Sequence, residues 1–158
     1  MTTATKTPIK PTWNVQKIQE EAVGSMTRHM MTTFQVIEKM GVEAQKQFGH
    51  AMIEMKVAYF KKLGVKTPID LVKALAEFEA NVFGSKISVW GDEKQASMEY
   101  EHCACWESMK KHAPMDEKKE QEMGNCWAEQ NDAMAKAFGF SKAEVKFDGP
   151  HAVVTYTK

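Results

Sequence analysis

Long apolar runs, a net charge and paired cysteines are all missing from this chain. No stretch is apolar over the length of a membrane span, and the first eleven residues lack the apolar core of a secretory signal. Basic and acidic residues number 21 each, so no overall field draws the chain to nucleic acid or an anionic membrane. We therefore expect a soluble, cytoplasmic protein with no nucleic-acid partner and no membrane partner.

The three cysteines are too few and badly spaced for a disulfide framework. Their number is odd, and Cys103 and Cys105 lie so close in sequence that a bond between them would be strained. Free thiols in a reducing compartment are the better interpretation. The chain also has no GxSxG, Walker, GxGxxG or HExxH motif, which removes the usual support for serine hydrolase, nucleotide-binding and zincin functions.

The length of 158 residues suits one domain with a substantial core, and 43% of the residues are hydrophobic. Residues 1–11 combine proline, threonine and lysine with little to bury, which predicts a flexible N-terminal arm. No repeat or linker divides the remainder. We expect a single α+β domain over residues 12–158.

Helical periodicity covers the first half of the chain. An apolar stripe from Val15 to Met40 predicts a long helix, and Gly41 interrupts it. A second stripe continues through residues 44–63, made by Ala44, Phe48, Met52, Met55, Tyr59 and Leu63. Thr67 and Pro68 then give a cap and a first-turn proline, which predict a third helix that ends at Gly84.

The second half alternates between hairpins and helices. Residues 86–102 have the pattern of a β-hairpin with a turn near Gly91, followed by a short helix around Trp106. A long helix capped by Asp116 ends at Gly139, and residues 143–156 form a closing hairpin. The predicted fold class is α+β, with two hairpins that form a roughly four-stranded antiparallel sheet covered by helices.

A candidate chemical centre begins where the second strand gives way to a helix. His102, Cys103, Cys105 and Glu107 lie at this junction, and strand ends are places where side chains reach a cleft. If the strand continues through Cys105, the two sulfurs share a face. If a helix starts at Cys103, they diverge.

The later helix supplies the second part of the candidate centre. Glu122, Cys126 and Glu129 are spaced i, i+4 and i+7, so they share one edge of that helix. A thiol between two carboxylates suits a thiolate with acid and base help, or a metal site. The candidate catalytic residues are Cys126, Cys103, Glu129 and Glu122, and the candidate substrate-binding residues are His102, Cys105, Trp106, Asn125 and Asp132.

A metal centre and simple packing are both alternatives for the same residues. Cys103, Cys105 and Cys126 could together hold zinc or iron, although this is not the paired CxxC pattern of strong metal sites. A free cysteine often acts only as a small buried hydrophobe. A haem or tetrapyrrole site using His29 is a third option, with no attachment motif behind it.

Short motifs in Glu99–Lys158 carry a family resemblance. They are Cys103-Ala-Cys105-Trp106, Gly124-Asn125-Cys126, Phe138-Gly139-Phe140 and the last hairpin. The segment resembles the L-2-amino-thiazoline-4-carboxylic acid hydrolase-like family and, more distantly, 4-vinyl reductase and Bet3-type domains. The resemblance implies helices packed against an antiparallel sheet and, in members that are enzymes, addition of water to a cyclic amidine carbon that opens a sulfur-containing ring.

Two functions follow as hypotheses from different classes. The first is a hydrolase-like protein with a cysteine and carboxylate pocket for a small-molecule ligand, acting as a C–N hydrolase on a thiazoline-type cyclic amidine. The second is a non-catalytic, metal-binding or accessory subunit of a larger complex, whose long amphipathic helices meet a partner subunit or form a homo-oligomer.

Overall fold

The computed structural model describes residues 10–148 and 151–158. The helices of the first half are α1 (Val15–Met40), α2 (Val42–Lys62), α3 (Pro68–Phe78) and the π-helical turn η1 (Glu79–Phe83). The first hairpin is β1 (Lys86–Gly91) and β2 (Gln95–His102), followed by α4 (Ala104–His112) and α5 (Glu117–Phe138). The second hairpin is β3 (Lys142–Asp148) and β4 (His151–Thr157). The predicted α+β class is confirmed.

Local capping signals set the starts of three helices. Thr67 and Asp70 form a capping box at α3, with Pro68 in its first turn. Asn14 caps α1 by accepting from the backbone of Lys17, and Asp116 caps α5 in the same way. Gly41, with φ of 97°, separates α1 from α2 where the sequence predicted a break.

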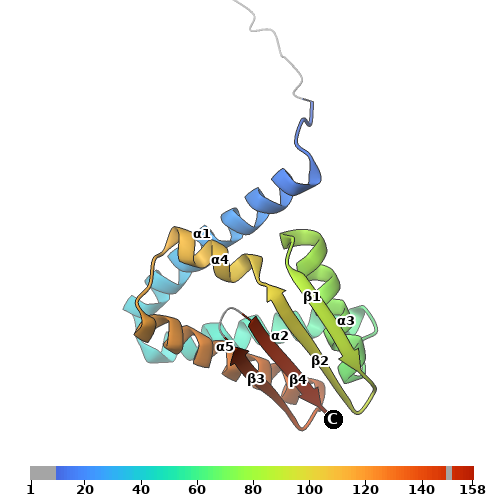
Figure 1. The fold of residues 1–158 in the computed structure, drawn as a ribbon. Helices are drawn as coiled ribbons and strands as arrows, with labels where there is room; N and C mark the ends of the chain where they lie inside the picture. Colours follow the sequence, from blue (N-terminus) through green and yellow to red (C-terminus); the bar gives the residue numbers. More distant parts are fainter. Residues whose placement is uncertain (1–9, 149–150) are drawn as a thin grey trace, which may run out of the picture.

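The four strands form one antiparallel sheet in the order β1-β2-β4-β3. β2 pairs with β4 at the centre, with Met98 opposite Val154, so the two hairpins join as expected. Helices α3 and α5 pack against one face of the sheet, and the other face looks toward the viewer in Figure 1. This gives the two-layer arrangement that the sequence predicted.

The main core lies between the sheet and the helices. Its fully buried side chains include Leu71 and Val72 from α3, Met98 from β2, and Val154 and Tyr156 from β4. α2 adds only one end of the helix to this core, through Val57 and Phe60. The densest packing is therefore in the sheet half of the molecule.

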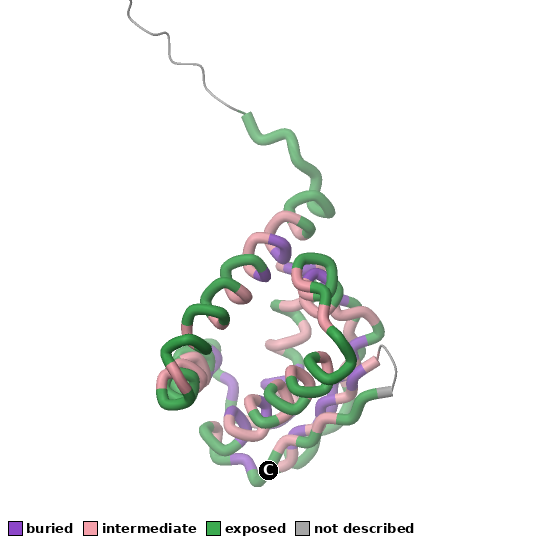
Figure 2. The backbone as a smooth tube through the Cα atoms, turned by 90° about the vertical axis from the view of Figure 1, so that its left-hand side faces the viewer, coloured by how far each residue is buried: buried purple, intermediate pink, exposed green. Residues whose placement is uncertain are grey.

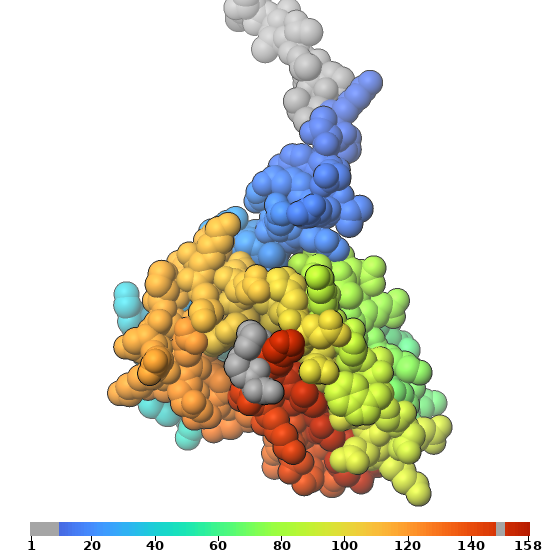
Figure 3. Space-filling model, viewed as in Figure 1, coloured from blue at the N-terminus to red at the C-terminus, as the bar shows by residue number. Residues whose placement is uncertain are grey.

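Helix α1 lies outside this core. It is buried only at Val23, Gly24 and Thr27, where it passes α4 and η1, and the tube in Figure 2 is otherwise exposed or half-buried along α1. Its first turns stand clear of the body in the space-filling view of Figure 3. A smaller cluster of Val23, Phe83 and Ala104 anchors it.

Only the first half of the predicted α2 stripe, with Ala44, Phe48 and Met52, is half-buried, and its second half faces solvent. Met55, Tyr59 and Leu63 are exposed, whereas the buried face is the adjacent one, with Val57 and Phe60. The docking of α2 onto α5 therefore selects a different face from the one that the apolar pattern favours.

Two predicted features fall partly outside the described residues. Residues 1–9 of the arm are not described, and Lys10 and Pro11 are exposed. The turn between β3 and β4 contains Gly149 and Pro150, which also lie outside the described residues. Among the helices that the structure describes, none has both the length and the apolar character needed to cross a bilayer.

Candidate functional site

A cleft of about 550 Å³ opens between the first half of α1, the end of η1 and α4. Gln19 and Gly24 line it from α1, Phe83 from η1, and Glu107 and Lys111 from α4. His102 reaches the same cleft from the end of β2. Polar and ionisable groups are frequent on these walls, which suits a small polar ligand more than a large apolar one.

His102 and Glu107 form a close polar pair on the wall of this cleft. Nδ1 of His102 lies 2.8 Å from Oε1 of Glu107, and the His102 side chain is 35% exposed. When Nδ1 carries its proton toward a carboxylate, Nε2 is the nitrogen left to accept a proton from a reacting group. The pair thus has the geometry of a histidine base oriented by an acid.

This pair is formed across the junction between β2 and α4. His102 ends β2, Ala104 begins α4, and Cys103 is the single residue between them. Glu107 therefore sits in the first turn of α4, directed back at the strand that precedes it.

A partly buried carboxylate, that of Glu79, lies behind the junction. Oε2 of Glu79 in η1 accepts from the hydroxyl of Ser85 at 3.1 Å and faces the thiol of Cys105 at 3.9 Å. Burial raises the pKa of Glu79, and the Ser85 hydrogen bond and the nearby Lys56 charge partly oppose that rise. π-helical turns often occur at functional sites, and this one brings Glu79 to the junction.

Ser85 connects this carboxylate to α4. Its hydroxyl oxygen accepts from the backbone N–H of Ala104 at 3.1 Å, and Ser85 is almost fully buried. The side chain of Cys103 makes no capping hydrogen bond at this helix start. Ser85 thus supplies the cap from a distant part of the chain.

The two cysteines of the junction are not activated thiolates. Burial raises the pKa of Cys103 to about 11, and burial together with the Glu79 charge raises the pKa of Cys105 further. A nucleophilic cysteine normally has a lowered pKa and an electropositive setting. The thiolate role predicted for Cys103 is therefore not supported, and Cys105 faces a carboxylate.

The predicted meeting of three thiols in one cavity is wrong. Cys103 packs against the main core, whereas Cys105 packs against the smaller cluster. Cys126 is exposed on α5, where its sulfur accepts from Gln130 at 3.5 Å. Within residues 10–148 and 151–158, no group of three His, Cys, Asp or Glu residues is placed to hold a metal ion, so the predicted zinc or iron set is not formed.

The acids predicted around Cys126 lie on the surface of α5. Glu122 pairs with Lys119 at 3.5 Å, and Glu129 is exposed. Asn125 accepts from Gln121 on the same exposed face at 3.1 Å. None of these residues lines the cleft between α1 and α4.

Two further predicted residues have structural contacts. Asp132 accepts from the backbone N–H of Ala143 at 3.1 Å and pairs with Lys136, so it ties α5 to β3. Trp106 is half-buried in the first turn of α4. Of the predicted substrate-binding residues, only His102 lines the cleft.

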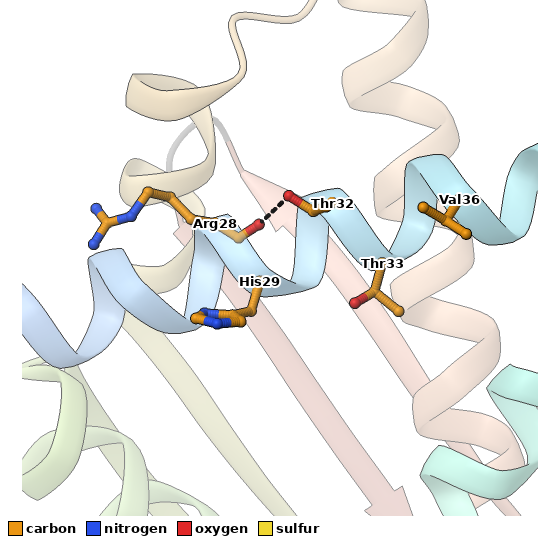
Figure 4. A pocket seen from close by; sticks show the side chains of 5 residues that line it. All are labelled: Arg28, His29, Thr32, Thr33 and Val36. Atoms are coloured by element: carbon orange, nitrogen blue, oxygen red, sulfur yellow. Dashed lines mark hydrogen bonds between the residues drawn. The ribbon is translucent and has the colours of Figure 1, made fainter.

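A second, more open groove of about 470 Å³ runs along α1. Arg28, His29, Thr32, Thr33 and Val36 line it, and Figure 4 shows His29 and Thr33 on one side of the helix. The Nδ1 atom of His29 lies 2.8 Å from the carbonyl oxygen of Ser25. This contact lies within a single turn of α1.

Glu79 and Ser85 were missed by reasoning from the sequence. They lie 26 and 19 positions before the residues they contact, Cys105 and Ala104. The one local signal is the Gly84-Ser85 pair after the apolar Val82 and Phe83, where a helix ends. A π-helical turn has no sequence pattern that would have placed the carboxylate.

Comparison with models of known protein families and with curated proteins gave no match for this chain.

Proposed function

We propose that this protein is a small-molecule hydrolase that binds its substrate in the cleft between α1, η1 and α4. The observation that carries the proposal is the 2.8 Å pair of His102 and Glu107 on the wall of that cleft. A histidine held by a carboxylate can take a proton from water in the reacting position. The two residues replace the cysteine and α5 carboxylates in the proposed chemistry.

The proposed reaction is the addition of water to a cyclic amidine of the thiazoline type. Nε2 of His102 takes one proton from the water as its oxygen bonds to the amidine carbon. The electron pair of the carbon–nitrogen double bond moves onto nitrogen, which then takes the proton that His102 holds. Glu107 stabilises the imidazolium while it exists. The ring opens when the hydroxyl on the tetrahedral carbon gives its proton to Nε2 of His102 and becomes the carbonyl oxygen. The bond from that carbon to the ring nitrogen breaks in the same step, and the nitrogen leaves as an amine that takes the proton from His102.

The cleft offers charges of both signs to such a ligand. Glu20 and Glu107 are acidic, and Lys111 and His112 stand on the α4 wall. Gly24 lies close to the α4 wall, because a Cβ built there would lie 3.6 Å from Nε2 of His112. A compact polar molecule fits this outline better than an extended chain.

The test is a hydrolysis assay on a panel of thiazoline-type cyclic amidines. The reaction is monitored as a decrease in the absorbance of the amidine. We expect His102→Ala to lower kcat by about 10²- to 10⁴-fold, as loss of a general base does. Cys126→Ser and His151→Ala are matched controls that should keep full activity. Turnover that survives His102→Ala, or that is lost in Cys126→Ser, would overturn the proposal.

A second function, an accessory subunit, is favoured by one separate observation. Val15, Ile18 and Met40 of α1, Met55 of α2 and Leu63 at the end of α2 are all more than half exposed. Extensive exposed apolar surface marks interaction sites in proteins. A stable complex with no turnover on the panel, seen by light scattering on the purified protein, would favour this function over the hydrolase.

A further inference from the structure

The start of α4 depends on one side chain from outside the helix. The first N–H groups of any helix have no partner within it, and a side chain at the preceding position usually accepts from one of them. At α4 that position is Cys103, which makes no such bond. The N–H of Ala104 instead donates to the hydroxyl of Ser85 at 3.1 Å.

Glu79 fixes the direction of that hydroxyl. The Ser85 O–H donates to Oε2 of Glu79 at 3.1 Å, so its lone pair is turned toward Ala104. The backbone N–H of Ser85 also donates to the carbonyl oxygen of Glu79 at 3.3 Å, across the end of η1. Two hydrogen bonds therefore connect Ser85 and Glu79, and the side-chain bond is partly buried.

We propose that Ser85 and Glu79 are positioning residues that hold the first turn of α4 against the end of β2, so that Glu107 stays within reach of His102. This role rests on the proposed function, in which His102 is the base and Glu107 orients it. Neither Ser85 nor Glu79 lines the cleft, so neither touches substrate. They act through the helix that carries Glu107.

The short junction explains why this support is needed. With Cys103 alone between β2 and α4, a small rotation of the first helical turn moves Glu107 relative to His102. The His102 and Glu107 side chains are 35% and 65% exposed, and side-chain pairs this exposed are too weak to fix a helix by themselves. The internal hydrogen bonds must therefore set the geometry.

The test is the tautomer of His102, measured by ¹H–¹⁵N NMR of the imidazole at about pH 8.5, where histidine side chains are ordinarily neutral. In the unmodified protein the proton should lie mainly on Nδ1, facing Glu107. Glu107→Ala should increase the ratio of the Nε2–H tautomer to the Nδ1–H tautomer severalfold. Ser85→Ala should give at least half of that change. Glu79→Ala should act like Ser85→Ala, and Glu79→Gln, which still accepts from Ser85, should restore the original ratio.

Ser88→Ala is the matched control, because Ser88 also donates to a glutamate, Oε1 of Glu101 at 2.7 Å, but does not touch α4. It should leave the tautomer unchanged. If Glu107→Ala leaves the ratio unchanged, the His102 pair and the proposed function fail together. If Glu107→Ala shifts it and Ser85→Ala does not, only the positioning role is overturned.

A measurement on the unmodified protein covers the case in which Ser85→Ala does not fold. Amide hydrogen exchange should show the Ala104 N–H protected at least tenfold more than a free helix end, because it is bonded to a buried hydroxyl. Fast exchange at Ala104 would overturn the inference without any substitution.

Discussion

The sheet half of the molecule and the helical pair α1 and α2 differ in how deeply their side chains are buried. In the sheet half, Leu71 and Tyr156 have no solvent exposure, and the buried polar groups are hydrogen-bonded. In the helical pair, Leu63 is 58% exposed and α1 is buried over a short stretch only. Stability is therefore concentrated in the sheet half, and the helical pair contributes the cleft and an uncovered apolar surface.

A matched pair of leucines gives the strongest contrast between the two regions. Leu71→Ala should lower the free energy of unfolding by about 2–5 kcal/mol, because it removes buried methyl groups and leaves a cavity. Leu63→Ala should change it by less than about 0.5 kcal/mol. Urea denaturation followed by circular dichroism measures both, and equal losses would show that the contrast is wrong.

A matched pair of tyrosines tests the polar part of the core. The Tyr156 hydroxyl is buried and donates to Oδ1 of Asn131 at 2.5 Å. Tyr156→Phe leaves that oxygen without its donor, which should cost about 1–3 kcal/mol in the free energy of unfolding. Tyr59→Phe on the exposed face of α2 should cost nothing measurable. A loss below about 0.5 kcal/mol in Tyr156→Phe would place this hydrogen bond among those that contribute little.

Glu79 provides a contrast that depends on pH. Burial raises its pKa in the folded protein, so between the unfolded and folded pKa values the folded state holds more protons than the unfolded state. The contribution of Glu79 to stability is therefore fully present below the unfolded pKa of about 4.3 and is lost as pH rises through the folded pKa. Above the folded pKa, ionised Glu79 lowers stability.

The variant Glu79→Gln cannot ionise and should lose this dependence. Measured by urea denaturation from about pH 4 to pH 8, its stability relative to the unmodified protein should increase as pH rises. Glu129→Gln, on the exposed face of α5, is the control and should follow the unmodified protein across that range. A Glu79→Gln difference that does not vary with pH would show that Glu79 has no raised pKa.

Local sequence signals predicted the helices and strands well. They did not predict which face of each helix packs against the rest of the protein. The capping box at Thr67 and the cap at Asp116 act within one turn, so their residues are enough to identify them. The stripe through Met55 and Leu63 has a sound helical period, yet docking on α5 buries Val57 instead. Periodicity identifies a helix but not which of two apolar faces the rest of the chain will cover.

The same limit applied to the candidate site. The junction at His102 was located because a strand pattern gives way to a helical one there. The sulfurs of Cys103 and Cys105 could not be oriented, since one residue decided where the helix starts. The bonds from Ser85 and Glu79 join segments far apart in sequence through a π-helical turn, and spacing carries no sign of such contacts.

The smallest expected effect on stability comes from charging the uncovered stripe. The double substitution Met55→Lys and Leu63→Lys should change the free energy of unfolding by less than about 0.5 kcal/mol, because both side chains are already in water. Val57→Lys, two residues along on the buried face, should unfold the protein, because a charge in the core has no partner there. A loss of about 2 kcal/mol or more in the double variant would mean that the stripe is covered in solution. Light scattering on the same samples tests whether a second copy of the chain covers the stripe. In that case the unmodified protein has the mass of an oligomer and the double variant has the mass of a monomer.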